Sequence, residues 1–113
     1  MMLNSDLLSI LKALAHESRL QIVEILLSQQ LCVGALARNL GISEGAASQH
    51  LQILRKSGLV IGEKHGYWTH YKVQTQRLQD AAEKLSCLPE RVLGLRDLNS
   101  EVSASFINQK GGE

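Results

Sequence analysis

The order of signals between Leu36 and Val73, which reads LARNLGISEGAASQHLQILRKSGLVIGEKHGYWTHYKV, most strongly limits what this chain can fold into. A short stretch with helical apolar spacing ends at Gly41, and glycine suits the left-handed position after a helix. Ser43 follows and can cap a second helix through its hydroxyl. After that helix, two segments rich in β-branched and aromatic residues flank a glycine, the pattern of a two-stranded ribbon. This succession predicts a winged helix-turn-helix, in which the second helix can enter the major groove of DNA.

Further helices are expected on both sides of this motif. Apolar spacing and capping residues predict five helices, at about Asn4–Ala13, Glu17–Ser28, Val33–Leu40, from the Ser43 cap to Ser57, and at Gln76–Cys87 after a Thr75 cap. The strands are expected at Leu59–Lys64 and Tyr67–Val73, joined by a turn at His65–Gly66. The predicted fold is therefore mainly α with a small β-ribbon.

The apolar residues also predict which faces point inward. The second helix is apolar around much of its circumference, which indicates central burial, and the fifth carries a stripe that lacks a partner. The expected inward residues are Leu3, Leu7, Ile10, Leu11 and Leu14 on the first helix and Ala47, Leu51 and Leu54 on the fourth. The stripe of the fifth helix consists of Leu78, Ala81, Ala82 and Leu85.

A length of 113 residues suits one compact domain. We expect a single domain over residues 1–113, with a core at about 4–88 and a C-terminal extension at 89–113. In that extension the pattern hints at one more amphipathic helix, and residues 109–113 are expected to fray. The residues that give this hint are Val92, Leu95, Val102 and Phe106.

Composition and motifs exclude several classes of protein. Hydrophobic residues are 44% and charged residues 20%, which argues against a disordered chain. No apolar run reaches the roughly 18 to 20 residues that span a bilayer, and the start MMLNSDLL does not resemble a signal peptide, so we expect a cytoplasmic protein without a membrane partner. The sequence shows no glycine-rich phosphate loop, activated nucleophile or paired catalytic carboxylates. We therefore expect neither an enzyme nor a cofactor.

Positive charge is concentrated in the predicted DNA-binding motif. Residues 38–77 contain six basic residues and two acidic ones, a net charge of +4, while the whole chain is at +1. The first 37 residues have a net charge of −1 and residues 78–113 of −2. The charge distribution therefore favours phosphate contact at the motif and other contacts at its flanks.

The outward face of the fourth helix carries the residue types that read bases. Ser48, Gln49 and Gln52 can approach base edges, and glutamine can make a bidentate pair with adenine. The basic side chains that would hold phosphates are Arg55, Lys56, Lys64 and His65. One alternative is a merely solvated helix face, and another is a winged-helix docking module that never touches nucleic acid. A docking surface would expose apolar residues, whereas this face is polar.

The segment SEGAASQHLQILRKSGLVIGEKHGYWTHYKV resembles the recognition helix and wing of the ArsR/SmtB family of metal- and stress-responsive repressors. The earlier ALAHESRLQIVEILL is similar to the helix that precedes the motif in that family, and the likeness runs from Leu7 to Leu88. The resemblance implies a homodimer formed through the first and fifth helices. It also implies that the dimer binds a near-palindromic DNA operator and releases it when an inducer, which the sequence does not identify, binds.

The same resemblance implies a set of DNA-contacting positions. They are Ser43, Ser48, Gln49, His50 and Gln52, with Lys64 and His65 at the wing. For His50, the alternative is a half-buried ring that bonds to a neighbouring backbone group.

The effector sites of the family are not reproduced. Arsenic-, cadmium- and lead-sensing members share a Cys-Val-Cys-Asp run at the third helix, where this chain reads Cys32-Val33-Gly34-Ala35, so only one thiolate of that pair is kept. Zinc-sensing members place histidines on the fifth helix, where residues 75–88 contain Asp80 but no histidine. We expect no metal site.

Two cysteines are too few for a secreted disulfide scaffold, and free thiols are expected in a reducing cytosol. Cys32 precedes a short helix, whose N-terminus favours the reactive thiolate. Some family members resemble thiol switches that pair a cysteine before the motif with one on the fifth helix, where Cys87 lies, but their first cysteine falls at the place of Glu24. Cys32 and Cys87 are therefore candidate redox or arsenical sensors, and the alternative is two structural cysteines.

Overall fold

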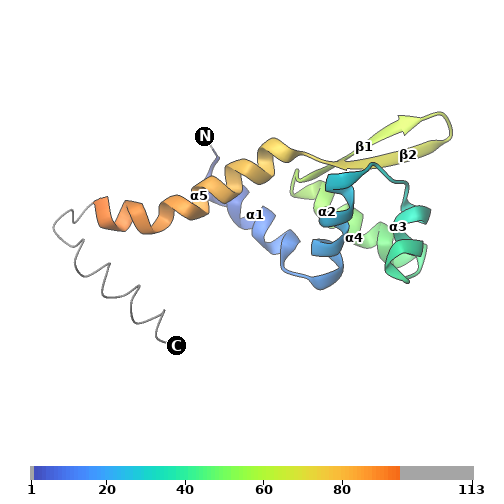
Figure 1. Ribbon diagram of the computed structural model, residues 1–113, viewed down its shortest axis with the longest axis horizontal. Helices are drawn as coiled ribbons and strands as arrows, with labels where there is room; N and C mark the ends of the chain where they lie inside the picture. The colour runs from blue at the N-terminus through green and yellow to red at the C-terminus, as the bar shows by residue number, and fades with distance from the viewer. Residues whose placement is uncertain (1, 95–113) are drawn as a thin grey trace. The chain divides into compact units, whose positions relative to one another are not determined.

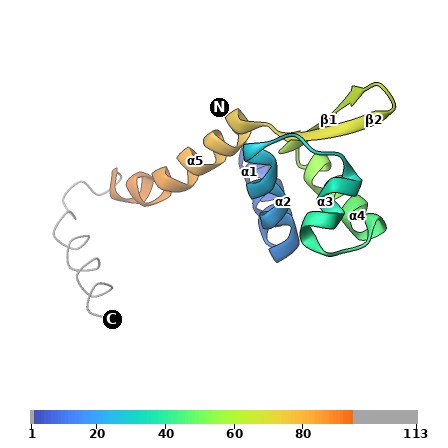
Figure 2. The ribbon, with the colours of Figure 1, turned by 45° about the vertical axis from the view of Figure 1, so that its right-hand side comes forward.

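The computed structural model describes the backbone of residues 2–94 and the side chains of residues 2–89. Its elements are α1 (Asn4–Leu14), α2 (Glu17–Ser28), α3 (Val33–Leu40), α4 (Glu44–Lys56), β1 (Val60–His65), β2 (Trp68–Val73) and α5 (Thr75–Gly94). Helices α3 and α4 lie next to each other, and the β1–β2 hairpin extends away from helices α1–α4 (Figures 1 and 2). The predicted class, mainly α with a small β-ribbon, is confirmed.

Local capping sets the turn between α3 and α4 as the sequence predicts. Gly41 ends α3 with φ +69°, a left-handed conformation that is strained for other residues. The hydroxyl of Ser43 then accepts a hydrogen bond of 3.0 Å from the backbone N–H of Ala46. This bond satisfies one of the free N–H groups at the start of α4. The turn therefore fixes the direction in which α4 leaves α3.

One core holds α4 in place. Its fully buried side chains come from α1, α2, α3, α4 and β1, together with Leu59 just before β1, so most elements of the motif contribute to it. The largest of them are Ile10, Ile22, Leu36, Leu51, Leu54, Leu59 and Val60. The predicted inner face of α4, which also includes Ala47, is confirmed. Burial of this kind stabilises a domain by about 1.5–3 kcal/mol for each large side chain.

Two expectations about burial were wrong. Leu3 lies at the N-terminal end of α1 and is 65% exposed instead of lying on the inner face. On α2, Leu20 and Leu27 are each 48% exposed, so this helix is buried on one side only. The reason is that a helix of the motif packs on its neighbours through a stripe, and the residues outside that stripe stay at the surface whatever their polarity.

The hairpin differs from the prediction by one residue. His65 pairs with Trp68, so the two-residue turn is Gly66–Tyr67 and not His65–Gly66. Gly66 has φ +66° and no residue other than glycine has positive φ among those described, which fits a turn that needs glycine only at its first central position. The correction moves His65 into β1 and leaves Tyr67 fully exposed in the turn.

Helix α5 begins earlier and ends later than predicted. Thr75 is its first residue instead of its cap, and the helix continues through Pro89 to Gly94. Proline removes one backbone N–H donor from a helix, and this weakens the pattern in the sequence without ending the helix. The remaining residues of the expected C-terminal helix, Leu95, Val102 and Phe106, lie outside the described residues, as does the tail 109–113.

By its internal contacts the chain divides into two compact units, Met1–Ala81 and Ala82–Glu113. The first contains α1 to β2 and the start of α5, where Ala81 is buried and Leu78 packs on the core. In the second, Leu85 and Leu88 are 40% and 43% exposed. In the part of the chain that the structure describes, no helix is both long and apolar enough to cross a membrane.

Candidate nucleic-acid interface

The outward face of α4 presents a row of polar and basic side chains. The predicted readout residues Ser48, Gln49 and Gln52 are all exposed, and so are the basic residues Arg55 and Lys56 near the end of the helix. This arrangement follows from helical periodicity, because the buried residues of α4 fix the opposite side of the helix. One apolar side chain of α4, Ile53, is 41% exposed and was missed by the sequence analysis.

Ser43 lies at the N-terminal end of the same helix and is exposed. Its oxygen accepts the bond from Ala46, so its structural role as a cap is clear while its hydroxyl proton stays available to donate. Glu44 occupies the first turn, where a negative charge is favourable beside the helix dipole. Local interactions therefore stabilise the N-terminal end of α4.

A groove of about 520 Å³ runs between the C-terminal half of α4 and the start of β1. It is lined by Gln52, Arg55, Lys56, Val60, Ile61 and Gly62. The guanidinium of Arg55 lies 5.8 Å from the centre of the Tyr71 ring, within the range of a cation–π contact. A groove with two cations on one wall suits a phosphate group of DNA.

Gly62 makes this arrangement of β1 and β2 possible. A Cβ atom at this position would lie 2.9 Å from Cγ2 of Thr69 and 3.1 Å from Cε1 of Tyr71. Both neighbours belong to β2, so a larger residue would push Tyr71 away from its place beneath Arg55. Neither Gly62 nor Tyr71 was predicted as a site residue, because their contact depends on the register of the hairpin.

The two predicted wing residues lie side by side in β1 but on opposite faces. Lys64 pairs with Thr69, and His65 pairs with Trp68, and neighbouring residues of a strand point to opposite sides. Both side chains are exposed. They therefore cannot make the same contact with a DNA backbone.

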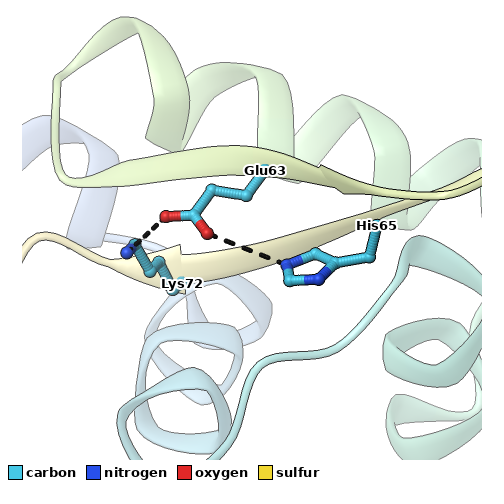
Figure 3. Close-up of polar contacts among 3 residues, drawn as sticks. All are labelled: Glu63, His65 and Lys72. Carbon is cyan, nitrogen blue, oxygen red and sulfur yellow. Dashed lines mark ion pairs between the residues drawn. The ribbon is translucent and has the colours of Figure 1, made fainter.

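The face that carries His65 also carries a carboxylate. Glu63 forms an ion pair with Lys72, and its Oε2 lies 3.7 Å from Nε2 of His65, as Figure 3 shows. The hydrogen bond from Lys72 and its positive charge lower the pKa of Glu63. The ring of His65 also stacks on that of His70, with centroids 4.8 Å apart. Part of the positive charge of the wing is thus neutralised within the wing.

Arg77, another cation of the motif, is engaged inside the fold. It comes from the first turns of α5, and its Nη2 donates a hydrogen bond of 3.2 Å to the carbonyl oxygen of Ser57. Gly58 leaves room for it, since a Cβ there would lie 2.8 Å from Nε of Arg77. Arg77 is one of the six basic residues counted in the motif, so the net charge of +4 overstates the charge that faces outward.

His50 lies on the inner edge of α4, half-buried between α4 and the start of α2. Its Nδ1 is 3.4 Å from Nη1 of Arg19, and its ring centroid is 4.6 Å from that of His16. Burial, followed by the nearby His16 and Arg19, lowers the pKa of His50. Its polar partner is a side chain, not the backbone group that the sequence analysis considered. Contact with DNA stays a prediction.

Both cysteines are free and half-buried. Cys32 is the residue before α3, as predicted, and makes no capping hydrogen bond through its side chain. Cys87 lies on α5 in the second compact unit. Among the described side chains, no group of three or more histidine, cysteine or acidic residues comes together as a metal site. Sensing by either thiol stays a prediction.

The fold and the exposed face of α4 define a winged helix-turn-helix DNA-binding protein. A sequence model described as "Bacterial regulatory protein, arsR family" matches residues 16–61, which span α2 to the start of β1. The chain belongs to the ArsR family of transcriptional regulators. The resemblance that its recognition helix and wing suggested is therefore confirmed.

Two relatives give this assignment its context. The chain is similar to the transcriptional activator HlyU of Vibrio cholerae serotype O1, with 41% identity over 76 residues that cover 67% of this chain and 70% of that protein. It is 44% identical to the arsenical resistance operon repressor of Escherichia coli K12 over 68 residues, which cover 58% of this chain and 57% of the repressor.

A solved structure matches as well. It is the homodimeric winged helix-turn-helix DNA-binding domain of Mb0332 from Mycobacterium bovis, described as a possible ArsR-family regulator. The two structures align with a TM-score of 0.64 and 27% identity, covering 80% of this chain and 84% of that one. The first two proteins are regulators by name and the third is described as a DNA-binding domain, so the comparisons support a regulator and not the docking module.

Proposed function

We propose that this chain is a homodimeric, cytoplasmic repressor that binds a near-palindromic operator and leaves it when an inducer binds. Bases would be read by Ser48, Gln49 and Gln52, with Ser43 and His50 beside them. The backbone would be held by Arg55, Lys56, Lys64 and His65. The observation that carries the proposal is the exposed face of α4 between Ser48 and Lys56, which is polar and basic apart from Ile53.

The groove beside α4 adds support for contact with duplex DNA. Its wall carries Arg55 and Lys56, and the β1–β2 hairpin extends from the same side of the motif. A helix in the major groove with a ribbon against the flanking backbone is the usual geometry of such motifs. The exposed polar face speaks against a purely apolar docking surface.

Dimer formation is supported by apolar side chains at the surface of α1 and α5. Leu3 and Leu8 are 65% and 52% exposed, and Leu85 and Leu88 are more than one-third exposed. The related domain of Mb0332 is homodimeric by its description. We expect half-sites about one helical turn, roughly 10 bp, apart or a multiple of it. A monomer at micromolar concentration in sedimentation, with no dimer formed on operator DNA, would contradict this.

A salt titration tests the DNA-binding step directly. Binding of labelled operator and of random duplex should weaken as salt rises, with a slope that reflects the number of phosphates contacted. Operator binding should exceed random binding at every salt concentration. Equal weak binding to both, without dependence on salt, would favour the docking module instead.

The sign of regulation needs its own test, because the relatives include an activator and a repressor by name. A reporter gene placed behind the operator should be expressed less when the chain is present. Increased expression would show that the chain activates.

We propose that the inducer acts on Cys32, with Cys87 as its partner in a thiol or arsenical switch. We do not expect the response to depend on a zinc site on α5. Two thiolates suit a disulfide or, with a third donor, a trivalent arsenical, whereas zinc usually takes four ligands. Operator binding of Cys32→Ser should no longer respond to oxidant or arsenite, and Cys87→Ser serves as the paired variant. If Cys32→Ser responds as the parent does to oxidant, arsenite and zinc, Cys32 is a packing residue.

A further inference from the structure

Arg19 connects the end of α1 to the recognition helix α4. Its Nε donates a hydrogen bond of 2.6 Å to the carbonyl oxygen of Ala13, and its Nη2 donates one of 3.4 Å to that of Lys12. Both carbonyls belong to the last turn of α1, where free acceptors and the negative end of the helix dipole attract a cation. The third nitrogen, Nη1, faces Nδ1 of His50 at 3.4 Å. Arg19 is thus anchored on one helix and directed at another.

The chemistry of this contact determines which ring nitrogen of His50 carries the proton. A guanidinium carries donors only and stays protonated in proteins, so Nδ1 of His50 must be the acceptor. A histidine whose Nδ1 accepts a hydrogen bond is neutral and carries its proton on Nε2. The two charged or titratable groups that face the ring, Arg19 and His16, both disfavour the imidazolium form. His50 therefore has one donor to offer, the Nε2–H group.

His16 restricts the ring from a second side. Its own Nδ1 accepts a hydrogen bond of 3.1 Å from the backbone N–H of Ser18, which holds the ring at the start of α2. The two imidazole rings then lie with centroids 4.6 Å apart and planes inclined by 48°. His50 is held between a fixed guanidinium and a fixed ring, directly after Gln49 on α4.

We infer that Arg19 is a positioning residue for DNA binding, which holds His50 as a neutral Nε2–H donor to a phosphate oxygen of the operator. The inference rests on the proposed function, because it assigns to DNA a contact at the edge of the same recognition helix, directly after Gln49. A neutral donor adds affinity without adding to the counterion release that a lysine contact produces. His50 is therefore expected to strengthen operator binding without changing its salt slope, unlike Lys64.

The first experiment examines the free full-length chain by NMR with ¹⁵N-labelled histidine at pH 7.5. Long-range proton–nitrogen correlations should show His50 neutral, with its proton on Nε2. In Arg19→Met the ring should become a mixture of tautomers. The matched control is Lys12→Met, which removes one exposed cation from α1 and should leave the His50 signals unchanged. A His50 ring with its proton on Nδ1, or charged at this pH, overturns the inference.

The second experiment measures operator binding by fluorescence anisotropy at several salt concentrations. His50→Gln places an amide donor where Nε2 lies and should stay within about threefold of the parent, whereas His50→Asn should lose about tenfold, the scale of one hydrogen bond. Neither variant should change the salt slope. Arg19→Met should lose more affinity than Lys12→Met, although each removes one positive charge.

The outcomes separate this inference from the proposed function. If the parent binds no duplex DNA, the proposed function fails, and the positioning role for DNA fails with it, while the NMR result still reports the Arg19–His50 contact. If the parent binds its operator but His50→Gln and His50→Asn bind equally well, only the positioning role is overturned. Because both histidine variants keep Arg19, the comparison stays valid even if Arg19→Met unfolds.

Discussion

The recognition helix α4 and the β1–β2 wing both carry basic residues, but they make those charges available to different degrees. Within the side chains that the structure describes, Arg55 and Lys56 of α4 form no salt bridge, whereas Lys72 of the wing is paired with Glu63. The wing residue His65 also lies beside the same carboxylate. The number of basic residues, read from a sequence, therefore overestimates the positive charge that a hairpin can offer to phosphate.

Backbone geometry explains the difference. In α4 the acidic residue, Glu44, lies in the first turn and the cations in the last, separated by about 17–18 Å along the helix axis at a rise of about 1.5 Å per residue. In the hairpin, antiparallel pairing brings Glu63 next to residues that follow the turn, with His70 directly opposite and Lys72 diagonal to it. Residues at similar separation in sequence thus stay apart on a helix and meet on a hairpin.

The largest expected effect concerns base recognition by α4. Replacing Gln49 with Ala should cost about 1–3 kcal/mol on the operator and much less on random DNA, because a bidentate contact with a base is lost. Competition binding with operator and random duplexes measures both values. If Gln49→Ala weakens both equally, Gln49 does not read bases and the contrast between helix and wing becomes weaker.

The next effect separates the two lysines of the wing. Lys64→Ala should weaken binding to all sequences and reduce the salt slope by about 1, as expected when one phosphate contact is lost. Lys72→Ala should change the slope less, because its ammonium group is already neutralised by Glu63. Equal changes of slope for the two variants would show that DNA displaces Glu63 from Lys72.

Much of this interface could be predicted from local sequence, and the rest depends on contacts between distant residues. The C-terminal end of α3 follows from Gly41 and the start of α4 from Ser43, because each residue affects only the backbone of its immediate neighbours. The turn was misplaced by one residue because Gly66 could occupy either central position of a two-residue turn, and the pairing of His65 with Trp68 decides between them.

Contacts across the fold gave no signal in the sequence. Arg19 and His50 are 31 residues apart, and nothing in either segment marks the other as a partner. The engagement of Arg77 with Ser57 likewise depends on where α5 starts, which Thr75 alone did not show. Helix faces, in contrast, were predicted correctly for α4, because periodicity fixes the exposed side once the buried residues are known.

A smaller effect tests the charge balance of the wing. Replacing Glu63 with Gln frees Lys72 and His65, so binding to random DNA should become tighter and its salt dependence steeper. The change should be smaller than that of Lys64→Ala, because exposed ion pairs contribute little. Glu24→Gln, which removes an exposed carboxylate from α2, is the matched control. An equal gain from both variants would indicate a general effect of net charge instead.

The smallest expected effect is a pH dependence of stability that should come from His50 of the recognition helix. The pKa of His50 lies below its usual value of 6.5 in the folded state, first through burial and then through His16 and Arg19. Below pH 6.5 the unfolded chain takes up a proton at His50 that the folded chain resists. The contribution of His50 to the free energy of unfolding is therefore fully present above this pH, and it is lost as the pH drops toward the folded pKa. Urea unfolding at pH 7.5 and 5.5 measures this loss. His50→Gln should reduce it, because the glutamine side chain does not take up a proton. If His50→Gln keeps the full loss of the parent, the ring of His50 is not protected from protonation at the inner edge of α4.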